Sequence, residues 1–479
     1  MTRAAGTAEA ARATRTRLLL EGPVGPTLAR LAAPNVVAML VSAATSIAEG
    51  WFAAASGVSA LAGLALVFPL VMLTQMLSAG SMGGAISAAV ARALGAGDAA
   101  RAGRVALAAW IIGLGFAALS LILVLAFGRP LFLLIGGGAA APAAEGMAYA
   151  TVYFAGAAAI WLCHATLSVI RGTGNMGAPS TILLFVALGS IPLSGALALG
   201  FGPLPAFGMA GIAAGAVIAH AGGAAAGLFL VLSGRAGLPL RGALAALASR
   251  DFADILRVGL VASLNAIQTV LTIVLMVALV SRFGEAALAG YGLGARLEFL
   301  MVPVVFGIGA ALTAMVGANI GAGNRARALR IAWTGAFAAA ALVGGIGLLV
   351  AAFPALWLGL FLDRGAAAWA AGEAYLRIVA PFYFFFGLGL ALYFASQGAG
   401  RMLWPVLSGL LRMAVAFGLA LALTGWFGFG VEGVFLGVAA GMAVFGAATA
   451  AAIRLGAWGG GLNAARPGEM VPRRTGETG

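Results

Sequence analysis

Charged residues are scarce in this chain of 479 residues, and lysine is absent altogether. Acidic and basic residues make up 9% of the sequence, whereas hydrophobic residues make up 63%. Soluble proteins carry roughly 25% charged residues, because polar side chains must cover their surface. Soluble, disordered and fibrous classes are therefore excluded. Together with a mean hydropathy of +1.08, the composition predicts an integral membrane protein.

Cysteine and histidine are also nearly absent. The single cysteine, Cys163, cannot form an internal disulfide, and its spacing from His164 and His220 is not that of metal ligands. The sequence lacks the Gly-rich phosphate-binding loop that ends in Lys-Ser or Lys-Thr, so no ATPase is encoded. No other catalytic constellation is visible. We therefore predict that the protein is not an enzyme and that it needs no metal and no cofactor.

Twelve apolar segments follow one another along the chain, and each can cross a bilayer as a helix of about 20 residues. The predicted fold class is an all-α membrane protein with twelve transmembrane helices. No cleavable signal peptide is visible, and residues 1–22 and 459–479 are polar and predicted to be disordered. The predicted spans are 28–55, 60–91, 104–127, 147–170, 177–200, 208–233, 254–281, 287–319, 327–353, 373–398, 403–425 and 431–455.

The 27 arginines lie mostly in alternate connections between these spans. Because they are not gathered in one patch, no nucleic-acid partner is expected. Positively charged loops remain in the cytoplasm, so we predict a multi-pass protein of the bacterial cytoplasmic (inner) membrane with both termini cytoplasmic. The connections predicted to be cytoplasmic carry Arg101, Arg104, Arg171, Arg235, Arg241, Arg250, Arg325, Arg327, Arg330, Arg401 and Arg454, whereas the opposite ones carry Arg129, Arg282 and Arg364.

Short motifs of the first half recur in the second half in the same order. Gly95–Arg104 (GAGDAARAGR) recurs 226 residues later as Gly321–Arg330 (GAGNRARALR). Arg171–Pro179 (RGTGNMGAP) recurs at the same offset as Gln397–Pro405 (QGAGRMLWP). The chain is therefore predicted to be a duplication. Two shorter repeats keep the order, namely ALAG at 60–63 and 287–290, and GMAG at 208–211 with GVEG at 430–433.

Each half contains an even number of spans, so both halves have the same orientation in the membrane. We predict two six-helix bundles related by a pseudo-twofold axis along the membrane normal, with a V-shaped cleft between them. This architecture is typical of transporters that bind substrate between the halves. The predicted division is an arm at 1–22, a first lobe at 23–233, a linker at 234–253, a second lobe at 254–455 and a tail at 456–479.

The ordered set of motifs, with the opening EGP at 21–23 and LAAP at 31–34, resembles the multidrug and toxin extrusion (MATE) family over roughly residues 21–455. Many members of that family have an acid, usually Asp, in the first helix before a GxxALAx turn; here Gly57–Gly63 supplies the turn and Glu49 stands in place of Asp. Many relatives also have an Asn-x-x-Leu-Asp pattern in the fifth span. This chain reads SIPLS at Ser190–Ser194, so an ion site resembling that of these relatives would lack its carboxylate here.

Glu49 is an acid deep within the first predicted span. Asn35, Ser42, Thr45 and Ser46 share its face of the helix. A carboxylate in the membrane costs about 2.5–3.5 kcal/mol to insert, and its removal from water favours the protonated form, so it can carry a proton or bind a cation. We predict that Glu49 couples transport to an ion and that Asn35, Ser42 and Thr45 bind substrate. The alternative is a hydrated interfacial glutamate outside any pathway.

The seventh predicted span has its own polar stripe, formed by Asn265, Gln268, Thr269 and Thr272. We predict that these residues also bind substrate, the alternative being hydrogen bonds between helices. Glu298, near the middle of the eighth span, is the second predicted ion-coupling residue. The alternative for Glu298 is a structural buried ion pair.

The resemblance implies a secondary antiporter that exports organic, cationic drugs or toxins in exchange for inward protons, with sodium as the alternative coupling ion. The expected partners are small organic cations and the lipid bilayer, and the expected state is a monomer. A lipid-linked oligosaccharide flippase of the same superfamily is one alternative, and it would need a strongly cationic cavity. A channel is the other alternative, and it would need a repeated filter that the sequence lacks.

Overall fold

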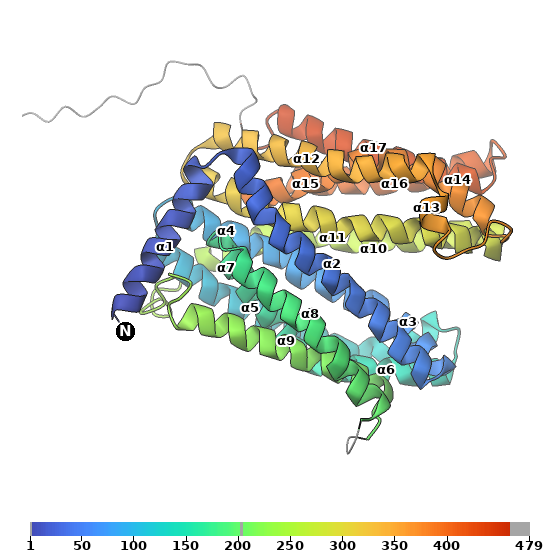
Figure 1. Cartoon of the computed structure of the whole chain (residues 1–479), viewed down its shortest axis with the longest axis horizontal. Coiled ribbons are helices and arrows are strands. Elements are labelled where there is room, and N and C mark those ends of the chain that lie inside the picture. Colours follow the sequence, from blue (N-terminus) through green and yellow to red (C-terminus); the bar gives the residue numbers. More distant parts are fainter. Residues whose placement is uncertain (1, 202–204, 460–479) are drawn as a thin grey trace, which may run out of the picture.

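Helices form almost all of the protein in the computed structural model, which describes residues 2–201 and 205–459. Two groups of helices lie together at one end of the bundle and diverge toward the other, so the molecule is V-shaped (Figure 1). We call these ends the linker end, which holds the connection 233–248 between the groups, and the far end.

The first group of helices contains α2 (Val24–Ser56), α3 (Val58–Gln75), α4 (Gly83–Gly95), α5 (Ala99–Ile135), α6 (Ala140–Ala155), α7 (Ala157–Gly172), α8 (Gly177–Leu199) and α9 (Gly208–Leu232). The second group contains α10 (Ser249–Val280), α11 (Glu285–Gly321), α12 (Arg325–Ala352), α13 (Ala355–Leu358), α14 (Trp369–Val379), α15 (Tyr383–Ala399), α16 (Leu403–Gly425) and α17 (Val431–Arg454). In the described residues, 11 spans are long and apolar enough to cross a membrane, and the bent pair α6–α7 brings the number to 12. The predicted all-α membrane fold is thereby confirmed.

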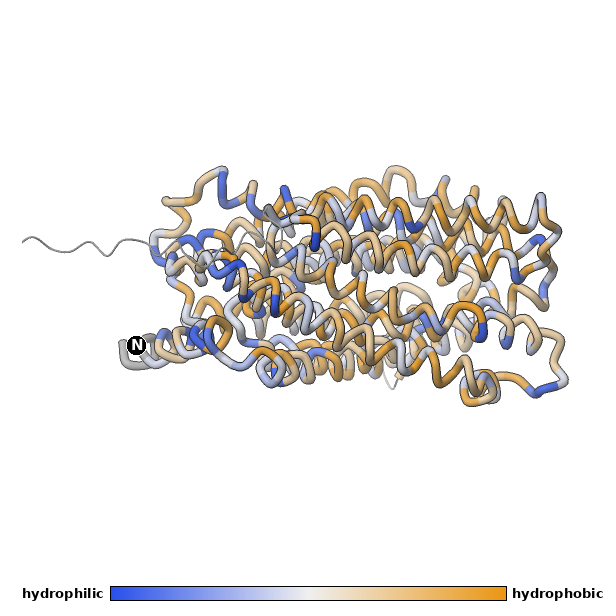
Figure 2. Tube along the Cα trace, turned by 90° about the horizontal axis from the view of Figure 1, so that it is seen from above, coloured by the Kyte–Doolittle hydropathy of each residue, from blue (hydrophilic) through white to orange (hydrophobic). Residues whose placement is uncertain are grey.

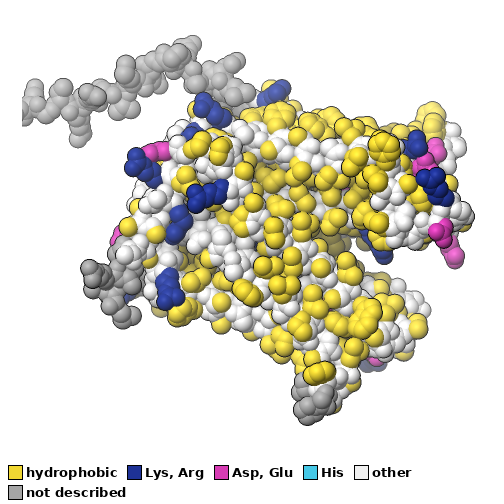
Figure 3. Space-filling view, in the orientation of Figure 1, with side chains coloured by type: hydrophobic (Ala, Val, Ile, Leu, Met, Phe, Trp, Pro, Cys, Tyr) yellow, Lys and Arg dark blue, Asp and Glu magenta, His cyan; other side chains and the backbone are white. Residues whose placement is uncertain are grey.

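Hydropathy follows the length of the bundle. Apolar residues dominate its middle and the polar residues gather toward its two ends (Figure 2). The space-filling view shows the same apolar surface around the body of the molecule, with basic side chains concentrated near the linker end (Figure 3). An apolar surface of this kind is stable only when hydrocarbon covers it. The chain is a multi-pass membrane protein.

Several spans are interrupted by bends. The second span consists of α3 and α4 joined by a π-helical segment, Met76–Met82. The fourth span bends by 51° between α6 and α7, at Gly156. The tenth span is interrupted by a 3₁₀ turn at Ala380–Phe382, which contains Pro381 and therefore lacks a backbone N–H donor. The fourth and tenth spans are equivalent in the sequence repeat. The duplication therefore includes the interruption of these two helices as well as their sequence motifs.

The two groups approach each other most closely at the linker end, where α4 meets α11. A Cβ atom on Gly95 would overlap the carbonyl oxygen of Ala318, and a Cβ atom on Gly321 would overlap the carbonyl oxygen of Arg92. Gly95 and Gly321 are equivalent in the 226-residue repeat, and so are Arg92 and Ala318. The two contacts are thus the same contact made twice about the pseudo-twofold axis. Small residues permit this approach, which lipid-embedded helices use for association.

The N-terminal segment is helical, and the prediction of disorder for residues 1–22 was wrong. Thr2–Glu21 forms α1, which lies across the linker end (Figure 1). Its Leu19 is buried, and the Leu19 carbonyl accepts a hydrogen bond from Asn319 Nδ2 at 3.0 Å. Arg327 donates a further hydrogen bond to the carbonyl of Gly22. The prediction of disorder rested on the polar composition of this segment alone. In the structure, contacts to α11 and α12 keep the segment in place. The other segment predicted to be disordered, 459–479, lies almost entirely outside the described residues.

The linker leads into α10, which begins at Ser249, inside the segment 234–253 predicted as linker. The Asp251 carboxylate accepts the backbone N–H of Ala248 at 3.1 Å and so satisfies one of the free donors at the helix start. It also accepts a hydrogen bond from Arg104 Nε at 3.1 Å. Arg101 pairs with Asp254 in the next turn. These ion pairs fasten the start of α10 to the start of α5.

Replacement of Gly321 by alanine is expected to destabilise the protein by about 1–3 kcal/mol, because the added methyl group overpacks the α4–α11 contact. The matched control is Gly345→Ala on α12, where a Cβ atom meets nothing within 4 Å. That substitution is expected to be neutral or to stabilise by up to about 0.5–1 kcal/mol, because alanine favours the helix. Unfolding of the two purified variants in detergent checks the opposite signs. Equal stability of the two would contradict the close contact.

Candidate functional site

A cavity of about 360 Å³ lies between the two groups of helices. α2, α3 with the π-helical segment, and α6 to α9 line one side of it, and α10, α11 and α15 line the other. All the acidic, basic and imidazole side chains among its lining residues come from the first group of helices. These side chains are Glu49, His164, Arg171 and His220. The cavity is therefore polar on one side and largely apolar on the other.

Glu49 lies on α2 in the half of the helix nearer the far end, and its carboxylate is in a polar corner of the cavity. The hydroxyl of Tyr149 lies beside this carboxylate, and no other group in the described residues hydrogen-bonds that hydroxyl. Tyr149 stacks on Tyr153 with ring centroids 5.7 Å apart. Gln75 Nε2 donates to the Tyr153 hydroxyl at 3.4 Å. Among the described residues, no basic side chain lies within 4.0 Å of the Glu49 carboxylate.

Two histidines from different helices meet at the cavity wall. The rings of His164 on α7 and His220 on α9 pack edge to face with centroids 5.6 Å apart. His164 Nδ1 lies 2.8 Å from Ser78 Oγ, and that hydroxyl already donates to the Thr74 carbonyl at 2.7 Å. His220 Nδ1 donates to the Ala216 carbonyl at 2.8 Å. The Ser78 hydroxyl has already donated its proton, and a carbonyl oxygen can only accept, so Nδ1 must be the donor in both histidine rings. Each Nε2 is then left for other contacts.

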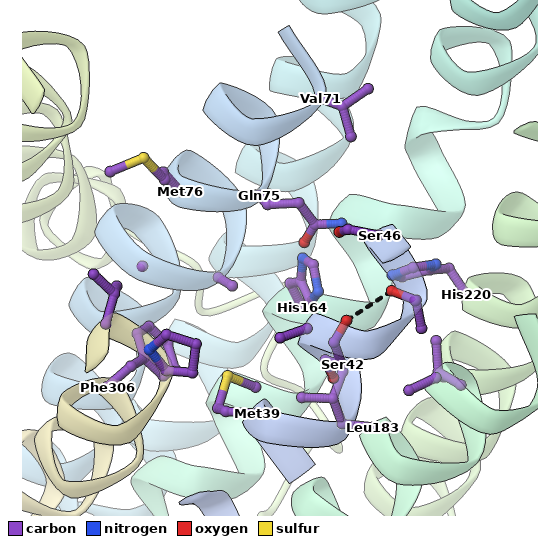
Figure 4. A pocket seen from close by; sticks show the side chains of 18 of the residues that line it. Met39, Ser42, Ser46, Val71, Gln75, Met76, His164, Leu183, His220 and Phe306 are labelled. Atoms are coloured by element: carbon purple, nitrogen blue, oxygen red, sulfur yellow. Dashed lines mark hydrogen bonds between the residues drawn. The ribbon is translucent and has the colours of Figure 1, made fainter. Parts of the chain in front are cut away.

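Figure 4 shows how these groups lie relative to one another. Ser42 and Ser46 on α2 lie close to His164 and His220, and Phe306 lies across the cavity on α11. Ser42 and Thr45 bond mainly along their own helix, since Ser42 Oγ donates to the Ala38 carbonyl at 2.8 Å and Thr45 Oγ1 to the Ser42 carbonyl at 2.7 Å.

Arg171 lies in the last turn of α7 and lines the cavity toward the linker end. Its side chain is buried, with only 4% exposed. This differs from its predicted place in a charged connection between spans. α7 continues one residue past Arg171, so the guanidinium is inside the bundle rather than in the loop.

The family model MatE matches residues 34–194 and 261–423, one match in each half of the duplication. The chain belongs to the MatE family. The resemblance inferred from the motifs is thus confirmed, and the protein is a MATE transporter rather than an enzyme.

Named relatives of this MATE transporter are distant. It is 25% identical over 317 residues to a protein named "FAD transporter" from Shewanella oneidensis, covering 65% of this chain and 68% of that one. It is 29% identical over 311 residues to "Probable multidrug resistance protein NorM" from Deinococcus radiodurans, covering 62% and 66% respectively.

Solved structures share the fold over nearly the whole chain. A structure described as MATE in complex with MaD3S has a TM-score of 0.82 at 22% identity and covers 90% of this chain and 95% of its own. A transporter of the MOP superfamily from Pyrococcus furiosus, whose description refers to reverse polarity of its binding pocket, has a TM-score of 0.80 at 23% identity, covering 91% and 96%. At this identity the likeness shows the fold alone.

The structure brings only part of the predicted substrate set to the cavity. Ser42, Thr45 and Asn265 line it, together with the predicted coupling residue Glu49. Asn35 does not, because it lies about two turns nearer the linker end, where its Oδ1 accepts a hydrogen bond from Ser180 of α8 at 2.8 Å.

The rest of the seventh-span stripe is turned away from the cavity. Gln268 and Thr272 are buried and hydrogen-bonded to each other at 3.4 Å, beside the space left by Gly409 of α16. Thr269 donates to the Asn265 carbonyl at 2.8 Å along its own helix. A stripe spaced i, i+3, i+4, i+7 covers a wide arc, and only its edge at Asn265 reaches the cavity.

Glu298 lies away from the cavity and forms an ion pair in the second group of helices. Its Oε1 accepts a hydrogen bond from Arg412 Nη2 of α16 at 3.2 Å, and its Oε2 accepts one from the Tyr375 hydroxyl at 3.1 Å. The Arg412 guanidinium also lies over the ring of Phe386, 5.3 Å from its centroid. Both carboxylate oxygens of Glu298 thus accept a hydrogen bond and its charge is neutralised, as a structural role requires.

Several cavity residues were missed by the sequence patterns. Tyr149 and Tyr153 are spaced i, i+4 and so share a helix face, but tyrosine in an apolar span gives no functional signal by itself. His164 and His220 are 56 residues apart in the sequence, and only the packing of α7 against α9 brings them together.

The Glu298–Arg412 pair is expected to be structural. Glu298→Gln leaves Arg412 charged and unpaired inside the bundle, which should destabilise the protein by about 3 kcal/mol. The double variant Glu298→Gln with Arg412→Gln should regain most of that loss. Unfolding in detergent measures both effects.

A pair of the same chemistry at the surface provides the control. Glu373 and Arg377 lie 2.8 Å apart with 34% and 59% of their side chains exposed. Glu373→Gln should change stability by less than about 0.5 kcal/mol. If Glu298→Gln were as stable as the native protein but no longer coupled transport to an ion, Glu298 would be a coupling residue after all.

Proposed function

We propose that this MATE transporter is an antiporter of the bacterial cytoplasmic membrane that exports organic, cationic compounds in exchange for inward protons. One observation carries the proposal: Glu49 is the single carboxylic acid among the residues that line the central cavity. The family establishes transport, and the position of this acid supports both the coupling ion and the charge of the cargo.

A single carboxylate can exchange one cation for another. Ionised, Glu49 attracts the positive charge of a bound organic cation in a site where little water screens it. Protonated, it is neutral and that attraction is lost. A proton arriving from outside therefore releases the compound, and departure of the proton toward the cytoplasm restores the site. One charge that crosses a potential of 100 mV supplies about 2.3 kcal/mol, enough for a modest gradient of exported compound.

The surroundings of Glu49 suit this exchange. No basic residue neutralises it in the described part of the chain, so its charge is available to a ligand or to a proton. The Tyr149 hydroxyl beside it can donate a hydrogen bond to the ionised form. The stacked rings of Tyr149 and Tyr153 offer faces that attract organic cations. Phe306 and Phe394 on the opposite wall provide apolar contact for a ring system.

The shape of the molecule supports alternating access. The lobes are in close contact at the linker end, through the α4–α11 crossing, and a notch separates them at the far end (Figure 3). The predicted distribution of arginines makes the linker end cytoplasmic, so this conformation would face outward. Breaking the α4–α11 contact while the far end closes would expose the same cavity to the cytoplasm, as transporters with repeated bundles do.

Protons are favoured over sodium as the coupling ion. A sodium site needs several oxygen ligands. The fifth span offers serines in place of the carboxylate that many relatives carry, and the Ser194 hydroxyl is already bonded to the Ile212 carbonyl at 2.9 Å. Glu49 then remains without a second carboxylate nearby. One acid alone is sufficient for a proton.

Ethidium efflux from energised, sodium-free cells tests the proposal. Cells that make the native protein should export ethidium, and a protonophore should abolish that export. Glu49→Gln should reduce export to the rate of cells without the protein, because its amide cannot take up a proton. Glu49→Asp keeps the carboxyl group and should retain part of the activity. Glu285→Gln removes an exposed acid at the start of α11 and should have no effect.

Three outcomes would overturn parts of the proposal. Native rates of efflux in Glu49→Gln would remove the role given to Glu49. Efflux that resists the protonophore but requires added sodium would replace the proton by sodium. Absence of efflux in cells that contain the folded native protein would refute export of this class of cation.

A further inference from the structure

Arg171 is a buried cation in the cavity without a partner. In the described residues its guanidinium forms no hydrogen bond and no ion pair, and its Nε is enclosed with no acceptor. Arg104 is the other arginine buried to a similar degree in the described residues. Unlike Arg171, it has a partner, because it donates to Asp251 at 3.1 Å. Buried polar groups are almost always satisfied, so an exception calls for a physical explanation.

Two serine hydroxyls beside Arg171 are also unsatisfied. Ser168 precedes Arg171 by almost one turn on α7, and Ser87 lies on the adjoining helix α4. Both Oγ atoms are buried and neither has a hydrogen-bond partner. The three residues line a small recess of about 20 Å³ that adjoins the main cavity. Gly83 leaves room there, since a Cβ atom on it would lie 2.7 Å from Ser168 Oγ.

Among the described residues, no acid forms an ion pair with Arg171. The titratable groups that interact with it are His164 and Cys163, and neither carries negative charge in its ordinary state at neutral pH. Glu49, the acid of the cavity, belongs to the half of α2 nearer the far end, whereas Arg171 is at the linker end of α7. An isolated charge in such a place is unfavourable, and an anionic group of a bound compound would compensate it.

We propose that Arg171, together with Ser87 and Ser168, binds an anionic group, a carboxylate or a phosphate, of the transported compound. A guanidinium matches the two oxygens of either group, and the serine hydroxyls supply further donors. This inference rests on the proposed export function. With Glu49 toward the far end, the cavity then suits compounds that carry an acidic group in addition to a basic one. The preferred cargo is thus zwitterionic rather than simply cationic.

Matched dyes test this proposal on the purified protein without any ion gradient. Rhodamine B carries a carboxylate and a delocalised positive charge, and its ethyl ester keeps only the positive charge. Fluorescence anisotropy should show that the native protein binds rhodamine B about tenfold or more tightly than the ester. Arg171→Gln should bind both dyes with equal affinity. Arg171→Lys, which keeps the charge but not the planar donors, should keep part of the preference.

Glu49→Gln is the internal control for the other charge. Both dyes carry the positive charge, so this variant should weaken both to a similar extent and leave their ratio unchanged. A second pair, riboflavin 5′-phosphate and riboflavin, differs by a phosphate instead of a carboxylate. The pair with the larger ratio of affinities in the native protein identifies the preferred anion. Because these are binding ratios, they remain decisive even if ethidium efflux fails.

Stability separates a ligand site from a structural arginine. Without dye, Arg171→Gln should unfold at the same temperature as the native protein or higher, because it removes an uncompensated charge. At equal concentration, rhodamine B should raise the unfolding temperature of the native protein by more than that of the variant, which binds the dye more weakly. The proposal is overturned if Arg171→Gln keeps the native ratio of affinities, or if in both pairs the native protein binds the compound with the anionic group and the compound without it equally. A lowered unfolding temperature with an unchanged ratio would make Arg171 structural.

Discussion

A charge inside an apolar bundle must have a partner or a use, and the structure is organised by this requirement. Glu298 and Arg412 neutralise each other between α11 and α16. Arg104 is neutralised where α5 meets α10. Glu49 and Arg171 have no such partner in the described residues, and both line the cavity. The paired charges hold the lobes in shape, whereas the unpaired ones are available to whatever crosses the membrane.

Close packing holds the lobes together, in addition to the ion pairs between α5 and α10. Lipid is as apolar as leucine, so helices in a membrane gain little from burial of apolar surface against each other and depend on close packing. Gly95 and Gly321 provide it twice at the linker end, and Gly307 of α11 leaves room for the backbone of Val36 on α2. A seam built from glycines is narrow and has few side chains to rearrange. At these glycine crossings the seam can therefore open with little loss of side-chain contacts, which favours alternating access.

The sequence was sufficient for the spans and the duplication, because both depend on composition and order along the chain. It was insufficient for the cavity, because periodicity defines a helix face but neither its depth nor its neighbour. Asn35 and Ser42 share a face, yet Asn35 binds Ser180 and Ser42 lines the cavity. Arg171 shows the same limit at a helix end. The predicted end of a span is accurate only to a few residues, and that difference decides whether an arginine lies in a solvent-exposed loop or inside the bundle.

The duplication also shows how one scaffold acquired two chemical roles. Tyr149 and Tyr375 are equivalent in the 226-residue repeat, and each lies beside a carboxylate. Arg412 neutralises the second carboxylate, whereas no residue in the described ranges neutralises the first, so of these two carboxylates only the first keeps an exchangeable charge.

Gln397 and Arg171 are likewise equivalent. Gln397 Nε2 donates across the seam to the carbonyls of Gly80 and Ser81, at 3.2 and 2.9 Å. The neutral amide thus fastens the lobes together, and the charged counterpart faces the cavity. If positions 171 and 397 carried the same residue, the protein would have either two amides that join the lobes or two charges that face the cavity. Because the two residues differ, Gln397 helps to close the linker end, whereas Arg171 gives the cavity wall a charge that can hold a charged cargo.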